Sequence, residues 1–215
     1  MALEALLESR LVVPSTVCSL LRGRRVCVAG SSEELLNRRW HVPRGCVVVA
    51  ADGATALLLE AGVVPDVVVT DLDGPWGALE EAARRGSLLV LYAHGDNVAS
   101  VRRFTGLLER FAAQAQCMLP GSQALLLPPT GFTDGDRAVG LVVLCGAEEL
   151  SLIGMEFGGR VAAGTKAWLR SSIEPWPEKR RKLAIAARIT SIWLGVHKLR
   201  RGTGIGPQSG HRDRG

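Results

Sequence analysis

Several short segments of this chain are apolar along their whole length, and this feature constrains the fold most strongly. A strand with one solvated face alternates apolar and polar residues, whereas a strand covered on both faces does not. A parallel sheet flanked by helices provides that two-sided burial. The segments with this pattern are residues 26–29, 46–51, 67–70, 87–92 and 150–154. We therefore expect them to be the strands of a mostly parallel sheet.

Segments of helical composition separate and follow these apolar runs. They are residues 54–61, 78–85, 99–113, 136–145 and 178–200. Gly62, Gly86 and Gly146 follow three of them, where a helix commonly ends. The alternation predicts a doubly wound, Rossmann-like α/β fold with helices on both faces of the sheet. Prolines and glycines in residues 115–132 and 158–177 predict irregular connections there.

The length of 215 residues, 47% of them hydrophobic, suits one α/β domain with small appendages. We expect an N-terminal helical segment over residues 1–25, the α/β domain over 26–200 and a disordered basic tail over 201–215. Glu4 and Glu8 occupy positions where a secretory signal would be basic and then apolar. The apolar runs are shorter than the roughly 20 residues that cross a bilayer. We expect a cytoplasmic protein without membrane contacts, and a homo-oligomer is compatible with the sequence.

The formal net charge is +5, and much of the excess lies after residue 178. The basic run 179–182 opens a predicted helix, where cations oppose the helix dipole, so it is either tolerated or close to an anion. Because no aromatic residues or known module accompany it, we do not expect nucleic acid as a partner. Cys27, Cys46 and Cys145 lie in apolar runs and are expected to be small buried residues without thiol or metal chemistry.

Acidic residues follow the predicted strands at the points where the strands end. Asp52 follows the second apolar run, Asp71 and Asp73 follow the third, and Asp96 follows the fourth. In a parallel sheet these positions share the edge at which such folds bind ligands. Carboxylates gathered there repel one another unless a cation lies among them. Mg²⁺ with a polyphosphate meets that need, because Mg²⁺ binds one or two carboxylates together with phosphate oxygens and water.

The spacing of Asp71 and Asp73 supports a shared metal. Residues two apart in an extended segment point to the same side, so both carboxylates can face one ion while Leu72 turns toward the core. The alternative is that these aspartates cap helices or shape turns. Their recurrence at successive strand ends favours the metal site.

A second acidic group opens the helix predicted near residue 136. Thr133 or Asp134 could cap this helix, and its free N–H groups could bind a phosphate. Asp134 or Asp136 could join the metal site, and Arg137 could pair with a phosphate.

Other candidates carry weaker patterns. Gly30 and Ser31 form a turn after the first strand that could bind phosphate, although the pattern favours Ser31 or Ser32 as a helix cap. His94 could orient substrate or exchange protons, or be structural. Lys166 lies in a predicted loop and could close over phosphates.

Taken in order, the motifs resemble those of the archaeal 6-hydroxymethyl-7,8-dihydropterin diphosphokinases over roughly residues 26–200. The matching segments are 51–55, 62–74, 94–97, 131–138 and 152–158. This family resembles thiamin diphosphokinases in its catalytic domain. Here Thr70-Asp71-Leu72-Asp73-Gly74 stands where those enzymes have Gly-Asp-x-Asp-Ser, and the β-rich thiamin-binding domain is not expected, which favours the pterin enzyme.

The resemblance implies Mg²⁺-dependent attack of a pterin hydroxymethyl oxygen on the β-phosphorus of ATP, with release of AMP, in tetrahydromethanopterin- or folate-type pterin biosynthesis. Asp71 and Asp73 would bind Mg²⁺, and Asp52, Asp96 and Asp136 could bind a second metal or the pterin, or accept its proton. The catalytic candidates are Asp71, Asp73, Asp96 and Asp136, with Asp71, Asp73 and Asp136 as metal ligands. The candidates for binding nucleotide or substrate are Gly30, Ser31, Asp52, Gly53, His94, Asn97, Thr133, Asp134, Arg137 and Lys166. The alternatives are a thiamin diphosphokinase and a non-catalytic protein that binds nucleotides or nucleic acid.

Overall fold

The computed structural model describes residues 11–38, 40–94, 96–105, 111–115, 126–166 and 168–202. Its centre is a six-stranded sheet in the order β5-β4-β3-β2-β1-β6, and every strand pair is parallel. The strands are β1 (Arg25–Ala29), β2 (Val47–Ala51), β3 (Val67–Thr70), β4 (Leu88–Ala93), β5 (Phe111–Ala115) and β6 (Glu149–Ile153). The expected α/β fold with a parallel sheet is confirmed.

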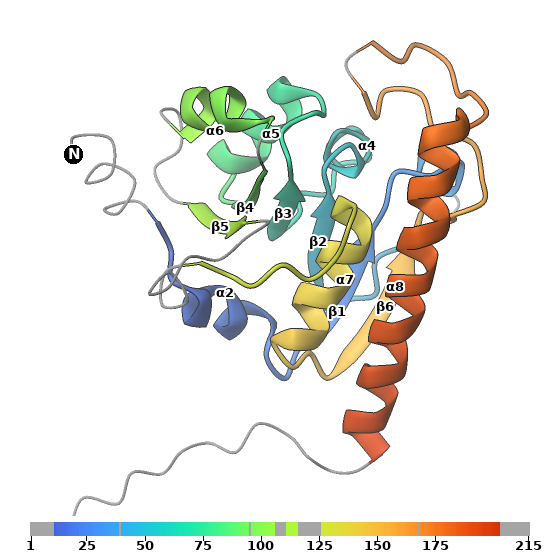
Figure 1. Ribbon diagram of the computed structural model, residues 1–215. Coiled ribbons are helices and arrows are strands. Elements are labelled where there is room, and N and C mark those ends of the chain that lie inside the picture. The colour runs from blue at the N-terminus through green and yellow to red at the C-terminus, as the bar shows by residue number, and fades with distance from the viewer. Residues whose placement is uncertain are drawn as a thin grey trace, which may run out of the picture.

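Helices cover both faces of this sheet (Figure 1). They are α2 (Pro14–Leu21), α3 (Glu33–Leu36), α4 (Ala54–Glu60), α5 (Trp76–Arg84), α6 (Val98–Thr105), α7 (Asp134–Leu144) and α8 (Pro177–Gly202). Side chains alternate along each strand, so Val26 and Val28 join the core under α7, whereas Cys27 and Ala29 join the core under α4 and α5. This two-sided burial explains why the strands are apolar throughout.

The strand order places a crevice at the carboxyl ends of β1 and β6. The chain builds β1 to β5 in sequence and then returns across the opposite face through α7 to form β6 beside β1. The loops after β1 and β6 touch, because Ser32 N donates to Gly154 O at 3.1 Å. A Cβ atom on Gly30 would lie 2.5 Å from Gly154 O, so the contact requires glycine there. The direction in which strands are added thus reverses between β1 and β6, and open α/β sheets bind ligands at such topological switch points.

One predicted helix is wrong in part. Residues 99–113 were expected to be helical, but α6 ends at Thr105 and residues 111–115 form the edge strand β5. Phe111 pairs with Leu89 on β4, and Leu127 forms an isolated bridge to Gln114. The strand is specified by these partners, since alanine-rich segments favour a helix by local propensity. Most of the irregular connection predicted for 115–132 lies outside the described residues.

The predicted terminal segments are tested only in part. Within residues 1–25 the structure describes α2, and residues 1–10 lie outside the described part. Helix α8 continues to Gly202, two residues past the expected boundary, and the rest of the predicted tail lies outside the described residues. Across the described ranges, no helix combines the length and apolar character needed to cross a membrane.

The interpretation of Cys145 as an unpaired apolar residue is wrong. Cys145 is buried, as expected, but it forms a disulfide with Cys18 across 127 residues of sequence. The bond joins α2 to the C-terminal end of α7. Sequence spacing could not identify this pair, because the two cysteines meet only after α7 packs on the sheet.

Candidate functional site

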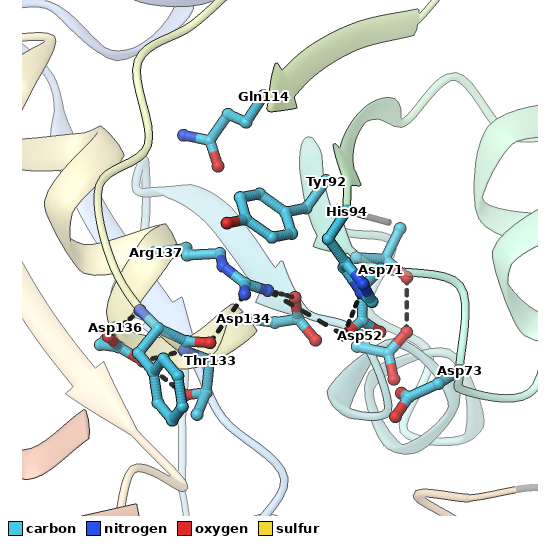
Figure 2. A network of polar contacts seen from close by, with 12 residues as sticks. Asp52, Asp71, Asp73, Tyr92, His94, Gln114, Thr133, Asp134, Asp136 and Arg137 are labelled. Atoms are coloured by element: carbon cyan, nitrogen blue, oxygen red, sulfur yellow. Dashed lines mark hydrogen bonds and ion pairs between the residues drawn. The ribbon is translucent and has the colours of Figure 1, made fainter. Parts of the chain in front are cut away.

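Four carboxylates meet at the carboxyl edge of the sheet. Asp52 follows β2, Asp71 and Asp73 follow β3, and Asp134 is the first residue of α7. One oxygen from each lies within 4.8 Å of the others. Figure 2 shows them facing a common space. We call these four residues the carboxylate cluster.

Asp52 is the most constrained member of the cluster. Its side chain is buried, and its backbone has a positive φ of 36°. Asp52 N donates to Val69 O at 2.8 Å, and the Thr70 hydroxyl donates to Oδ1 at 2.5 Å. Burial raises the pKa of Asp52 to about 7; the Lys166 ammonium opposes this rise and the Asp73 carboxylate adds to it.

Asp71 and Asp73 both reach the cluster and Leu72 turns toward the core, as expected, but the segment is not extended as the spacing argument assumes. Leu72 between them is buried in the core and has a φ of 69°, and its N–H donates to Thr70 Oγ1 at 2.8 Å. Burial and the neighbouring Asp73 charge raise the pKa of Asp71. The pKa of Asp73 is lowered although burial works against this, because Lys166 pairs with it. Asp71 Oδ1 is buried and has no hydrogen-bond partner among the described residues.

The start of α7 separates the roles of Asp134 and Asp136. Asp136 is fully buried and lies outside the cluster: it accepts hydrogen bonds from the N–H groups of Phe132 (2.6 Å) and Thr133 (2.7 Å), and from the Thr133 hydroxyl. Asp136 is therefore held in the capping turn and is not brought to the carboxylates assigned with it (Figure 2). Asp134 points toward the cluster, and burial together with the charges of Asp71 and Asp52 raises its pKa.

Arg137 holds Asp134 in place. Its Nη1 donates to Asp134 Oδ1 at 2.9 Å, and its Nη2 donates to Phe132 O at 2.7 Å. The guanidinium also lies over the Tyr92 ring, 3.5 Å from the ring centre (Figure 2). Arg137 Nε is buried without a partner among the described residues, so the guanidinium positions Asp134 and keeps donors in reserve, and the phosphate contact expected from the sequence stays a prediction.

Lys166 lies among the carboxylates. Its Nζ pairs with Asp73 and is 3.5 Å from Asp52 Oδ2. The pKa of Lys166 is raised, because these carboxylates outweigh the opposing effect of burial. The preceding Thr165 packs so closely on the start of α4 that a Cβ atom on Gly53 would lie 2.4 Å from Thr165 O. The Lys166 loop therefore packs against the site, and Gly53 makes its approach possible.

The segment after β4 supports the same edge. Asn97 is buried, and its amide donates to Asp71 O at 2.9 Å and to Tyr92 O at 2.8 Å, which ties the ends of β3 and β4 together. His94 Nε2 lies 3.7 Å from Asp71 Oδ2, and Nδ1 contacts Asp96. Asp96 is largely exposed and outside the cluster, so it can orient His94 but does not meet the other carboxylates.

An open pocket extends from Asp52 and Asp134 of the cluster along the switch point. Its lining includes Gly30, Ser31, Ser32, Asp52, Gly53, Thr133, Asp134, Gly135, Met155, Glu156, Lys166, Lys179 and Leu183. Ser32 also caps α3, since its hydroxyl accepts from Glu34 N at 3.3 Å, as one of the two sequence interpretations predicts. No role was predicted for Tyr92 or Thr70. Tyr92 is the single tyrosine of the chain and lies near the end of β4, and this position is the signal that could have identified it.

Together, the fold and site define a doubly wound α/β protein with a carboxylate-lined ligand pocket at its topological switch point. The chain belongs to the 6-hydroxymethylpterin diphosphokinase MptE-like family, whose sequence model matches residues 10–161. This confirms the resemblance inferred from the motifs. Lys166 and α8 lie beyond the matched residues.

Three archaeal relatives are each named 6-hydroxymethyl-7,8-dihydropterin pyrophosphokinase. The protein from Methanothermobacter thermautotrophicus is 43% identical over 148 residues, which cover 68% of this chain and 62% of the relative. The Pyrococcus furiosus protein is 41% identical over 146 residues, covering 68% and 61%. The Methanocaldococcus jannaschii protein is 32% identical over 167 residues, covering 73% and 68%. The matched part thus spans a little over three fifths of the first two relatives.

Proposed function

We propose that this protein transfers diphosphate from ATP to the hydroxymethyl group of 6-hydroxymethyl-7,8-dihydropterin and releases AMP. The observation that carries the proposal is the carboxylate cluster beside an open pocket, in a chain whose family and relatives are named for this reaction. The acceptor rests on the relatives' names, whereas the phosphate and metal chemistry rests on the residues of the site.

The carboxylate cluster fits a divalent cation such as Mg²⁺. Its donors are hard carboxylate oxygens, and Asp71 Oδ1 is buried without a partner among the described residues. Asp52, Asp71, Asp73 and Asp134 would hold the ion; Asp136 is left out of this set because its oxygens accept hydrogen bonds in the α7 cap. A cation bound here would neutralise negative charge on the phosphates.

The remaining residues position the reactants. Arg137 holds Asp134 in place, and Asn97 holds the backbone at Asp71. Lys166 can exchange its carboxylate partners for phosphate oxygens when the nucleotide enters.

In the reaction, a bond forms between the hydroxymethyl oxygen and the β-phosphorus, and the bond from that phosphorus to the oxygen of AMP breaks. We assign the hydroxymethyl proton to His94 Nε2, which faces Asp71 while Asp96 orients the ring.

An assay of AMP release with different acceptors tests the proposal. Purified protein is incubated with ATP and Mg²⁺, and with either 6-hydroxymethyl-7,8-dihydropterin or thiamin. We expect stoichiometric AMP and pterin methyl diphosphate with the pterin, and no AMP above background with thiamin. Activity with thiamin alone would instead identify a thiamin diphosphokinase, and nucleotide binding without AMP from either acceptor would identify a non-catalytic protein.

The proposal also covers the location, pathway, related enzymes and partners of the protein. We place the protein in the cytoplasm, in tetrahydromethanopterin- or folate-type pterin biosynthesis, and regard its α/β domain as similar to thiamin diphosphokinase catalytic domains. The partners are ATP and the pterin, without nucleic acid or membrane, and self-association into a homo-oligomer is left to measurement.

A further inference from the structure

Helix α8 provides one wall of the pocket. Lys179 in its first turn and Leu183 one turn later both line the pocket. Residues four apart lie on the same face of a helix, so this face of α8 is turned toward the ligand space. Figure 1 shows α8 running along the face of the molecule that α7 also covers. The other basic residues of this turn, Arg180, Arg181 and Lys182, are exposed.

Lys179 differs from Lys166 in having no partner. Among the described residues, no hydrogen bond or ion pair engages its ammonium group, whereas Lys166 pairs with Asp73. Lys179 is also partly buried, unlike Lys182 on the same helix. Burial and the charge of Lys166 lower the pKa of Lys179, although the carboxylates of Asp73 and Asp134 oppose this change. Lys166 and Lys179 thus line the same pocket, and among the described residues only Lys166 of the two forms an ion pair.

Burial and the charge of Lys166 together outweigh the attraction of Asp73 and Asp134, so a bound anion would stabilise the charged form of Lys179. Two ammonium groups repel each other, and the N-terminal end of a helix adds partial positive charge. An exposed lysine would relieve the repulsion by turning into solvent, but Lys179 lines the pocket. A polyphosphate between the carboxylate cluster and α8 would pair with Lys179 and satisfy the unpaired charge.

We propose that Lys179 is a binding residue for the polyphosphate of the nucleotide, contributed by a helix that lies beyond the residues matched to the family. Lys179 then contacts the phosphates from α8, and Lys166 contacts them from its position among the carboxylates. The inference rests on the proposed function for the identity of the anion. It adds a residue for which the motifs predict no specific ligand.

Nucleotide binding by matched lysine variants tests this inference. The probe is the Mg²⁺ complex of α,β-methylene-ATP, which cannot be cleaved between the α- and β-phosphorus, and the dissociation constant is measured by calorimetry. Losing one charge-assisted contact in Lys179→Met is expected to weaken binding about 10- to 100-fold. Lys179→Arg is expected to retain most of the affinity. Lys182→Met, which removes the same charge from an exposed site, is expected to bind within about twofold of the wild type.

Three further readouts separate binding from folding and from the proposed function. Thermal unfolding of Lys179→Met is expected at or above the wild-type temperature, since an unpaired, partly buried charge is removed, and adenosine, which has no phosphate, is expected to bind both proteins equally. If the wild type binds the ATP analogue and Lys179→Met binds it within twofold, or if Lys182→Met loses as much affinity, the inference is overturned and the proposed function stands. If the wild type does not bind the analogue, both are overturned.

Discussion

Asp52 occupies a position that disfavours its own charge. Its carboxylate is buried beneath Gly74, where a Cβ atom would lie 2.5 Å from Oδ2, and its Oδ1 accepts the Thr70 hydroxyl. Burial raises the pKa of Asp52 to about 7. A buried carboxylate of this kind is suited to binding a cation, because the cation offsets both the cost of burying the charge and the repulsion from neighbouring carboxylates.

The cost of that charge predicts a pH-dependent effect of Asp52→Asn on stability. The folded pKa of Asp52 near 7 exceeds the unfolded value of about 4, so the folded state binds more protons between these pH values and loses stability as pH rises through them. In metal-free protein, Asp52→Asn is expected to raise the free energy of unfolding by about 1–3 kcal/mol at pH 8 and to change it little at pH 4. Urea denaturation in a chelator at both pH values measures this.

A difference that is the same at pH 4 and pH 8 would contradict this account of Asp52. Asp136→Asn is the matched control, because Asp136 is also buried but accepts three hydrogen bonds from the α7 cap. We expect Asp136→Asn to destabilise the protein at pH 8, by about 1–3 kcal/mol, because one of its oxygens becomes a donor facing other donors.

At the level of single residues, the sequence predicts three members of the carboxylate cluster but does not decide the fourth. The ends of parallel strands must share an edge, so Asp52, Asp71 and Asp73 converge for reasons visible in the sequence. The choice between Asp134 and Asp136 depends on which direction each side chain takes at the first turn of α7. The capping hydrogen bonds and Arg137 set that direction, and the spacing of residues in the sequence cannot predict it.

At the scale of elements, the Lys166 loop depends on a glycine in another segment. Gly53 has an ordinary helical conformation with φ of −60°, so alanine there would be tolerated by the backbone. The obstacle is the 2.4 Å approach that a Cβ atom would make to Thr165 O. Gly53→Ala is therefore expected to displace the loop, destabilise the protein by about 1–3 kcal/mol and weaken binding of the Mg²⁺–ATP analogue. Thermal unfolding and calorimetry measure the two effects.

Gly195→Ala is the control for that substitution. Gly195 lies within α8, and in the described part of the chain no atom outside its own helix neighbourhood lies within 4 Å of its Cβ position. Alanine there is expected to stabilise the protein by up to about 1 kcal/mol through helix propensity and to leave nucleotide binding unchanged. Equal effects of the two substitutions would show that the contact between Gly53 and Thr165 has no special role.

The elements themselves were predictable to different degrees. Strands β2 and β3 are rich in valine, and their composition and two-sided burial point to the same structure. Strand β5 is Phe-Ala-Ala-Gln-Ala, whose local preference is helical, and its pairing with β4 and bridge to Leu127 make it a strand. The contribution of α8 to the pocket was also beyond sequence reasoning, because it depends on how α8 packs against α7.

For the whole molecule, the Cys18–Cys145 disulfide joins the N-terminal helix to the helix that carries Asp134. It closes a loop between residues 127 apart in sequence, which restricts the unfolded chain strongly. Reduction is expected to lower the free energy of unfolding by about 2–5 kcal/mol. Urea denaturation with and without dithiothreitol measures the change.

The double variant Cys18→Ala/Cys145→Ala provides the comparison for reduction. Its stability is expected to lie close to that of the reduced wild type and to be insensitive to dithiothreitol, although Cys27 and Cys46 remain as free thiols. An oxidised wild type with the same denaturation midpoint as the reduced protein would contradict a stabilising role for the bond.

The central claim for the molecule is that the carboxylate cluster performs diphosphoryl transfer, and Mg²⁺-dependent AMP formation from ATP and 6-hydroxymethyl-7,8-dihydropterin tests it most directly. Asp71→Asn is expected to fold like the wild type and to lose at least about 100-fold in kcat, because Asp71 combines an unpartnered buried oxygen with a place in the cluster. Glu60→Gln, at an exposed position in α4, is expected to retain full activity. Turnover by Asp71→Asn at the wild-type rate would contradict the assignment of this cluster as the active site.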